Sequence, residues 1–241
     1  MTVINGDCLE EMPKMAKGSV DMILTDLPYE KTKLVWDSPI NLIKMWDCFN
    51  HVLKENGVVV MTTQQPFTTK VINSNLEMYK QQLIWLKTRP SNVFNAKKMF
   101  MNWHEEILIF YKKLPTFNPQ MEQGKPYKKT HYLQQREKGV YNKTGEKDGH
   151  ISESNGTRYP KTVLEISNPN KNSLHPTQKP VPLFEYLIKT YSNEGDTVLD
   201  CCAGSGTTGV ACKKTNRGYI LIEKEKIYYD MIIKRIEENI D

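Results

Sequence analysis

The stretch from Asp196 to Gly209, DTVLDCCAGSGTTG, constrains the fold more than any other part of this 241-residue chain. Its residues 197–199 are β-branched or aliphatic, and they predict a short strand that ends at an acid, Asp200. The glycines that follow allow a tight turn whose backbone can approach a ligand closely, because no Cβ stands in the way. Residues 207–214 then predict a helix. A strand, a glycine turn and a helix N-terminus in this order favour a nucleotide-like cofactor over an ordinary turn.

Gly204, Gly206 and Gly209 match the G-x-G-x-x-G spacing of dinucleotide-binding proteins. Glu223 follows a second predicted strand, residues 219–222, and is placed where an acid could accept from both ribose hydroxyls. A nicotinamide-dependent oxidoreductase is therefore one hypothesis. Only 32 residues follow Gly209, however, which is too few for the second half of a dinucleotide domain. The strands that complete this sheet must come from earlier in the chain.

Length and composition predict one sizeable α/β domain with an insertion, or two small domains. With 39% hydrophobic residues the chain can bury a core, and no apolar run approaches the roughly 18 residues of a membrane span. The N-terminus lacks the basic-then-apolar pattern of a signal peptide. Five cysteines without a C-x-x-C pair argue against a disulfide framework and against a zinc site. We expect a cytoplasmic, reduced protein without a metal.

The positive charge is concentrated in residues 112–162, which hold eleven Lys and Arg against five Asp and Glu. This excess of six is larger than the net charge of +5 of the whole chain, so the remainder sums to −1. Tyrosines are interleaved with the basic residues, and such a mixture favours nucleic acid, with rings on bases and cations on phosphates, over a solvated, disordered insertion. The predicted DNA contacts are Lys125, Lys128, Lys129 and Arg136.

Hydrophobic periodicity predicts alternating strands and helices on both sides of the basic segment. The predicted strands are residues 2–5, 22–25, 58–61, 82–87, 106–111, 163–166, 197–199 and 219–222. The predicted helices are residues 9–17, 40–53, 66–75, 181–191, 207–214 and 227–240. The second strand ends at Asp26-Leu27-Pro28-Tyr29, at the kind of strand end where α/β proteins build their sites. Taken alone, that tetrapeptide is a weak signal, and Asp7 by itself indicates a helix cap.

Four motifs in order resemble one family: GDC at 6–8, DLPY at 26–29, HPTQKP at 175–180 and DCCAGSG at 200–206. The chain resembles the S-adenosylmethionine-dependent DNA amino-methyltransferases of the circularly permuted β class, adenine-N6 type. The resemblance implies a Rossmann-like α/β sheet in which residues 1–111 form the catalytic half, 112–162 a target-recognition insertion and 163–241 the cofactor half. It covers nearly the whole chain and is weakest over 112–162. It also explains how the sheet is completed, because in the family the strand before Asp7 belongs to the cofactor half.

The resemblance also implies roles for individual residues. The turn at 200–206 would hold the methionine part of S-adenosylmethionine, Glu223 the ribose and Asp7 the adenine amino group, while Cys8 offers a backbone N–H. Residues 175–180, Lys179 above all, would line the methionine end. The complete set of expected cofactor residues is Asp7, Cys8, Lys179, Asp200, Ala203, Gly204, Ser205, Gly206, Thr207 and Glu223.

The implied catalytic residues are Asp26, Leu27, Pro28 and Tyr29, which would receive the target base. An exocyclic amine is a poor nucleophile because its lone pair is delocalised into the ring. A carboxylate and a carbonyl that accept its two hydrogens can free that lone pair, and a proline-stiffened turn aims both acceptors. Tyr29 would stack on a base turned out of the duplex. The family usually has proline at the position of Leu27, but a carbonyl alone can be supplied by any residue.

The prediction is therefore a DNA methyltransferase that modifies N6 of adenine, as an acid at position 26 is mostly found in the adenine-specific members of the resembling family. N4 of cytosine is the first alternative. An RNA methyltransferase, a nicotinamide oxidoreductase and a binding module without activity are further alternatives. A homodimer stays open beside a monomer. The oxidoreductase leaves DLPY and HPTQKP unexplained, and the inactive module leaves the two strand-end acids unexplained.

Overall fold

The computed structural model describes residues 1–29, 39–131, 150–168 and 178–238. The chain divides into two compact units. Unit 1 consists of Met1–Asn118 and Lys161–Asp241, and unit 2 of Pro119–Pro160. The strands of the predicted α/β body all belong to unit 1, and unit 2 lies within the basic segment recognised in the sequence.

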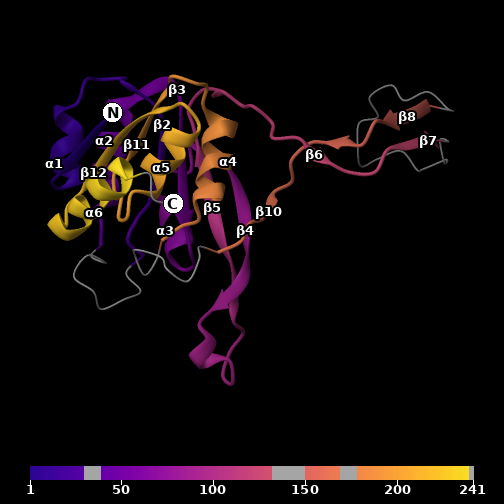
Figure 1. Ribbon diagram of the computed structural model, residues 1–241, viewed down its shortest axis with the longest axis horizontal. Coiled ribbons are helices and arrows are strands. Elements are labelled where there is room, and N and C mark those ends of the chain that lie inside the picture. Colours follow the sequence, from indigo (N-terminus) through magenta and orange to yellow (C-terminus); the bar gives the residue numbers. More distant parts are fainter. Residues whose placement is uncertain (30–38, 132–149, 169–177, 239–241) are drawn as a thin grey trace. The chain divides into compact units, whose positions relative to one another are not determined.

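Unit 1 is built on an eight-stranded sheet with the order β1-β12-β11-β2-β3-β5-β4-β10 (Figure 1). Neighbouring strands are parallel, except that β5 is antiparallel to both β3 and β4. The strands are β1 (Thr2–Asn5), β2 (Val20–Asp26), β3 (Leu53–Thr63), β4 (Tyr79–Ser91), β5 (Asn102–Phe110), β10 (Val163–Glu165), β11 (Thr197–Asp200) and β12 (Gly218–Glu223). The predicted α/β fold is confirmed.

The sheet is completed from the N-terminal end of the chain, as the sequence predicts. β1 pairs in parallel with β12, with Thr2 opposite Ile220 and Asn5 opposite Glu223. β2 pairs on the other side of β11, with Leu199 opposite Ile23. β11, the strand before the glycine turn, therefore lies between β12, from the C-terminal part of the chain, and β2, from the N-terminal part.

Helices cover both faces of the sheet, so that each face has its own hydrophobic core. The helices of unit 1 are α1 (Cys8–Glu11), α2 (Leu42–Val52), α3 (Phe67–Ser74), α4 (Val181–Tyr191), α5 (Thr207–Lys214) and α6 (Lys226–Glu237). Side chains of α1, α2 and α3 pack in one core, and side chains of α4, α5 and α6 in the other. None of the helices in the described part of the chain is long and apolar enough to span a membrane.

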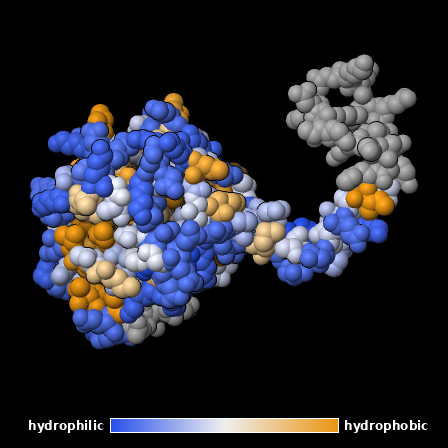
Figure 2. Space-filling view, turned by 90° about the horizontal axis from the view of Figure 1, so that it is seen from above, coloured by the Kyte–Doolittle hydropathy of each residue, from blue (hydrophilic) through white to orange (hydrophobic). Residues whose placement is uncertain are grey.

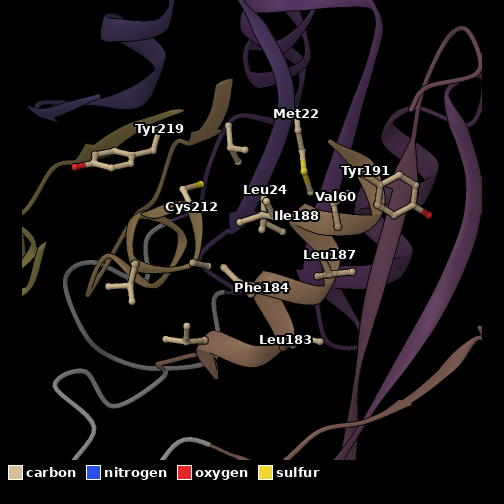
Figure 3. Close-up of a cluster of buried hydrophobic side chains, with 14 of the residues drawn as sticks. Met22, Leu24, Val60, Leu183, Phe184, Leu187, Ile188, Tyr191, Cys212 and Tyr219 are labelled. Carbon is tan, nitrogen blue, oxygen red and sulfur yellow. The ribbon is translucent and has the colours of Figure 1, made fainter. Parts of the chain in front are cut away.

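The alternation of side chains along β2 supplies both cores, since successive residues of a strand point to opposite faces. Met22 and Leu24 belong to the core under α4, whereas Ile23 belongs to the core under α2. Figure 3 shows the first of these cores, in which four α4 side chains approach the sheet. The α4 side chains labelled there that are almost fully buried are Leu183, Phe184, Leu187 and Ile188.

Several predicted elements differ from the structure at their boundaries, and three of the differences have a plain local cause. The helix predicted for 9–17 ends at Glu11 and continues only as a 3-10 turn, Met12–Lys14, because Pro13 has no N–H to donate. The helix predicted for 40–53 is α2, but its end is Val52, since Leu53 is already extended and pairs with Val20. Residues 88–105, which lie between two predicted strands, are strand at both ends, over 88–91 and 102–105, because β4 and β5 continue past the core as a two-stranded hairpin.

Unit 2 contains short strands where the sequence shows no sustained period. They are β6 (Glu122–Gln123), β7 (Tyr127–His131), β8 (His150–Ser154) and β9 (Thr157–Arg158). β6 pairs with β9 and β7 with β8, both antiparallel. The described surface of this unit is largely hydrophilic (Figure 2). Pairing between strands at both ends of the segment thus organises a composition that by itself resembles a solvated loop.

Candidate active site

Asp26 is the last residue of β2, and its carboxylate is surrounded by three donors from three parts of the chain. The Tyr29 hydroxyl donates to Oδ1 at 2.5 Å, and the Thr62 hydroxyl donates to the same oxygen. The Lys179 Nζ lies 2.6 Å from Oδ2. The carboxylate of the predicted catalytic motif is therefore held in a fixed orientation at the carboxyl edge of the sheet.

Lys179 is 6% exposed, and a second acid shares its charge. Its Nζ is 3.4 Å from Glu105 Oε2, and Glu105 Oε1 is 3.2 Å from Lys87 Nζ. Burial lowers the pKa of Lys179, but the carboxylates of Asp26 and Glu105 outweigh this effect and raise it above its usual value. Burial similarly raises the pKa of Glu105, and Lys179 and Lys87 outweigh it and lower that pKa. Both groups are charged at neutral pH, in an alternating row of two acids and two lysines.

The aromatic residue of the DLPY motif lies directly beside this row of charges. The Tyr29 ring packs against the Phe67 ring at 5.7 Å between centroids, and Lys179 Nζ is 5.4 Å from the Tyr29 centroid. Burial and the nearby Asp26 carboxylate raise the pKa of Tyr29 well above its usual value, so the hydroxyl stays a donor. Leu27 is 2% exposed, and its side chain packs in the core under α2. This packing is separate from any role of its backbone carbonyl. Pro28 joins Leu27 to Tyr29 in the turn after β2.

The glycines after β11 form the tight turn that the sequence predicts. Gly204 and Gly206 have φ of +51° and +78°, in the left-handed region that side chains disfavour. A Cβ on Gly204 would meet no atom within 4 Å, so the space above this residue is open to a ligand. A Cβ on Gly209 would lie 2.7 Å from the Leu221 side chain, and this glycine lets α5 pack closely on β12.

Asp200 stands between the glycine turn and the catalytic strand, 3% exposed. Its Oδ1 accepts from the Thr25 hydroxyl at 2.9 Å and from the Cys202 N–H at 3.1 Å, and its Oδ2 accepts from the Thr208 hydroxyl. Burial raises the pKa of Asp200 to about 7, against the lowering effect of these hydrogen bonds. Its carboxylate thus ties the turn to the residue that precedes Asp26 and to the first turn of α5.

Glu223 and Asp7 lie at the ends of the next two strands along the same edge. Glu223 is 8% exposed, and it accepts from the Gly204 N–H at 2.8 Å and from the Glu225 N–H at 2.9 Å. Burial raises the pKa of Glu223 above its usual value. Asp7 caps α1 by accepting from the Leu9 N–H at 2.9 Å and pairs with Lys224 at 3.1 Å. The structure therefore brings Asp7, Glu223 and the glycine turn to one edge of the sheet, although they come from opposite ends of the chain.

A side chain of α6, Arg235, holds two further residues of the predicted cofactor turn, Ser205 and Thr207. Arg235 is 1% exposed and donates to the Ser205 carbonyl at 2.9 Å and to the Thr207 hydroxyl at 3.2 Å. The Thr207 hydroxyl also lies 3.4 Å from the Lys179 carbonyl. The Ala203 N–H donates to Ile222, which fixes the start of the turn against β12.

Three cysteine side chains meet beside this turn, although the sequence contains no C-x-x-C pair. The sulfur atoms of Cys8, Cys201 and Cys202 all lie within 4.8 Å of one another. Hydrogen bonds from Cys201 and then from Cys202 lower the pKa of Cys8 well below that of an ordinary thiol. Spacing along the chain could not indicate this cluster, because β1 and β11 approach each other only through β12.

The predicted DNA contacts within the described residues belong to unit 2. Lys125, Lys128 and Lys129 are exposed there, and Lys128 pairs with Glu153 at 3.2 Å. Arg158, which the sequence did not single out, lies 4.8 Å from the Tyr127 ring centroid. Arg136 and the first three residues of the HPTQKP motif, 175–177, lie outside the described residues.

Sequence reasoning missed several residues that shape the site: Thr25, Thr62, Lys87, Glu105, Thr208 and Arg235. The threonines are common strand and helix residues, and nothing in their spacing marks them. Lys87 carries a weak signal, since it is a charged residue within a predicted strand, whereas Glu105 lies outside the predicted strands and only the structure places it in β5. Arg235 falls in an amphipathic helix, where a basic residue ordinarily faces solvent.

Comparison with known proteins finds similarity over nearly the whole chain. Type II methyltransferase M.HinfI of Haemophilus influenzae is 30% identical over an alignment that covers 98% of this chain and 68% of that protein. DNA adenine methyltransferase YhdJ of Escherichia coli K12 is 30% identical, with 98% of this chain and 82% of that protein covered. Type II methyltransferase M.HpaI of Haemophilus parainfluenzae is 27% identical, with 98% and 74% covered.

Solved structures show the same fold. The M1.HpyAVI–SAM complex has a TM-score of 0.66 and 26% identity, with 97% of this chain and 98% of that chain covered. The cytosine-N4-specific PvuII DNA methyltransferase has a TM-score of 0.69 at 16% identity, with 97% and 85% covered, a likeness of fold alone. The family model described as DNA methylase, for N6 and N4 methyltransferases, matches residues 20–234. This match includes the Asp26 site and the glycine turn, and the chain therefore belongs to the N6/N4 DNA methylase family.

Proposed function

We propose that this protein transfers a methyl group from S-adenosylmethionine to N6 of adenine in DNA. One observation carries the proposal: the Asp26 site and the glycine turn stand at the carboxyl ends of two adjacent parallel strands, β2 and β11. Ligands of open α/β sheets bind at this edge. The hydrogen bond of 2.9 Å from Thr25 to Asp200 joins the two sites directly.

The residues around the glycine turn fit the cofactor. The space above Gly204 is open, and Glu223 lies close enough to accept from the Gly204 N–H at 2.8 Å. Each Glu223 oxygen keeps a lone pair beyond the backbone bond that it accepts, which suits two ribose hydroxyls. Asp7, which caps α1 two residues after the end of β1, would accept from an adenine amino group. S-adenosylmethionine, when bound, supplies a methyl group on a positively charged sulfur, and M1.HpyAVI is a neighbour whose structure contains SAM.

Asp26 and the Leu27 carbonyl would accept the two hydrogens of the target amine. The Thr62 and Lys179 contacts hold the carboxylate in one orientation before the base arrives, so little reorganisation is needed during transfer. Tyr29 donates to Asp26, and its ring, which contacts Phe67 and lies near Lys179, would stack on a flipped base. The proton that the amine loses would leave by way of these oxygens or water.

We extend the proposal to the order of the halves. In this reading the chain is circularly permuted, with residues 1–111 as the catalytic half, 112–162 as target-recognition insertion and 163–241 as the cofactor half. The pairing of β1 with β12 supports it, because an N-terminal strand adjoins the C-terminal strands that carry the glycine turn. The separate compactness of Pro119–Pro160 supports the insertion.

Adenine is favoured over cytosine by the acid at position 26 and by the similarity to YhdJ, a DNA adenine methyltransferase. The likeness to the cytosine-N4-specific PvuII enzyme concerns the fold and does not choose the base. Mass spectrometry of nucleosides from DNA methylated by the purified protein tests this choice. We expect N6-methyladenine. N4-methylcytosine without N6-methyladenine would contradict the adenine assignment, and methylated RNA without methylated DNA would contradict the substrate.

A further inference from the structure

The hairpin formed by β4 and β5 extends well past the catalytic aspartate. Asp26 is level with Thr62 of β3, which pairs with Ile107 of β5. β5 begins five residues before Ile107, at Asn102, and at about 3.3 Å per residue this places its start roughly 17 Å beyond the level of Asp26. Figure 1 shows the hairpin reaching beyond the other strands of the sheet. Residues 92–101 connect the two strands, and we call them the hairpin tip.

The hairpin tip exposes an unusual amount of apolar surface. Phe94 is 105% exposed and Phe100 97%, and Val93 and Met99 are each more than half exposed. Single exposed apolar residues are ordinary, but four within eight positions on a projecting turn indicate a surface that binds a partner.

The charge around these residues is of one sign. Lys97 and Lys98 lie between the two phenylalanines, and both are exposed. Arg89 precedes the tip, and residues 88–103 contain no Asp or Glu. Aromatic rings beside cations, without acids, match the two chemical features of DNA, stacked bases and phosphates.

Local hydrogen bonds give the tip a defined shape before any partner binds. Asn92 has a φ of +66°, and its Oδ1 accepts from Asn95 Nδ2 at 2.5 Å. The Asn95 carbonyl accepts from the N–H groups of Lys98 at 2.8 Å and Met99 at 3.0 Å. Because this turn is already ordered, less conformational entropy is lost when it binds.

The two strands of the hairpin also contribute residues to the proposed catalytic site. Lys87 of β4 and Glu105 of β5 are joined at 3.2 Å, and Glu105 contacts Lys179, the partner of Asp26. The Lys87 Nζ also lies 3.1 Å from the Ser91 hydroxyl at the end of β4. A duplex whose base reaches Asp26 would therefore pass beside the strands that carry the tip.

We propose that the hairpin tip binds double-stranded DNA next to the target base, with Phe94 and Phe100 against bases and Lys97 and Lys98 on phosphates. The inference rests on the methyl transfer to DNA proposed above. A base that leaves the stack exposes the faces of its neighbours, and an apolar side chain can cover them. The tip supplies that surface at the edge where the base would turn out.

The test compares three variants with the unmodified protein: F94S/F100S, K97A/K98A and, as a matched control, L76A. Leu76 is 63% exposed and precedes β4, at the end of the strand opposite the tip. The measurements are binding to a short fluorescein-labelled DNA duplex by anisotropy, the KM for unmethylated plasmid DNA, and S-adenosylmethionine affinity by calorimetry. Cofactor affinity shows that each variant is folded.

We expect F94S/F100S to weaken duplex binding and raise the KM for plasmid by about thirtyfold or more, because two stacking contacts are lost. K97A/K98A should reduce the slope of log K against log salt by about 1.8, for two phosphate contacts. Duplex binding and KM should be unchanged in L76A, and the affinity for S-adenosylmethionine should be unchanged in all three variants.

Wild-type duplex binding and KM in F94S/F100S would overturn the inference. If F94S/F100S binds the duplex like the wild type but changes from a dimer to a monomer in sedimentation, the inference is also overturned. The partner of the tip is then a second copy of this chain. If the unmodified protein methylates no DNA at all, the proposed function fails, while duplex binding by the variants still decides the role of the tip.

Discussion

Lys179 lies 2.6 Å from the Asp26 carboxylate, although 153 residues separate the two. The contact joins the last residue of β2 to the segment before α4, and it places a buried positive charge against the proposed acceptor for the target amine. Glu105 is a second acid beside that charge, with its Oε2 3.4 Å from the Lys179 Nζ. If Asp26 accepts from the target amine as proposed, its strength as an acceptor depends on how Lys179 divides its charge between Asp26 and Glu105.

The two halves of the site should be separable by substitution. Asp26→Ala should abolish methyl transfer and leave the affinity for S-adenosylmethionine nearly unchanged, because Lys179 keeps Glu105 as a partner. Glu223→Ala should weaken the cofactor by roughly 1.5–3 kcal/mol if two charge-assisted hydrogen bonds are lost. Calorimetry measures both affinities. Glu223→Gln, which keeps one acceptor oxygen for the Gly204 N–H, controls for disruption of the turn. Equal losses of cofactor affinity in the Asp26 and Glu223 variants would contradict the assignment.

Glu105 should act as a positioning residue through Lys179. Glu105→Gln removes one of the two negative partners of a buried lysine, so the remaining charge acts on Asp26 alone and makes it a weaker acceptor. We expect kcat to fall about tenfold, which corresponds to about 1.4 kcal/mol, with the cofactor affinity unchanged. Steady-state kinetics across a pH series measures the effect.

Two further variants separate positioning by Glu105 from a general structural role. Glu105→Asp should recover part of the lost rate, because it restores the charge. Glu106→Gln alters the neighbouring acid, which contacts Thr68 and His104 rather than Lys179, and should have little effect on kcat. A loss of thermal stability in Glu105→Gln that accounts for the whole decrease in activity would argue against positioning.

Asp200 should make the protein more stable as the pH falls from 7 to 4. Burial raises its pKa from 3.8 to about 7 in the folded protein, so the folded state binds a proton that the unfolded state releases over this range. The free energy of unfolding should therefore rise on acidification, by roughly 3 kcal/mol at most, relative to Asp200→Asn.

Denaturant unfolding of the two proteins at several pH values measures this difference and cancels the groups they share. Asp47→Asn, at an exposed position of α2, serves as the control and should show no comparable change. A difference between wild type and Asp200→Asn that is the same at pH 4 and pH 7 would mean that Asp200 does not titrate in this range.

The basic segment should contribute a measurable part of the DNA affinity. Replacing Lys125, Lys128 and Lys129 with alanine should reduce the slope of log K against log salt by up to about 2.7, at about 0.9 per phosphate contact. Fluorescence anisotropy with a labelled duplex gives the slope. Three exposed lysines near the amino ends of β2, β3 and β4 provide the control: Lys17, Lys54 and Lys80. A slope that changes equally in both triple variants would mean that position does not matter and that net charge alone sets the affinity.

The sequence by itself determined the α/β fold, because its period-2 and period-3.6 patterns are local properties that survive any arrangement of the elements. It also determined the strand-end positions of Asp26, Asp200 and Glu223, and the tight glycine turn after Asp200. The limits of α4 and α5 were predicted to the residue, because proline or glycine punctuates their starts.

Only the tertiary structure decided which side chains meet. The β4–β5 hairpin brings Glu105 and Lys87 to Lys179, the crossing of α6 under the glycine turn buries Arg235, and the β1–β12 pairing leads Cys8 to Cys201 and Cys202. These contacts join residues far apart in the chain, and no local sequence pattern predicts them. Charged residues in a strand or an amphipathic helix ordinarily face solvent, and here only the packing of neighbouring elements buries them.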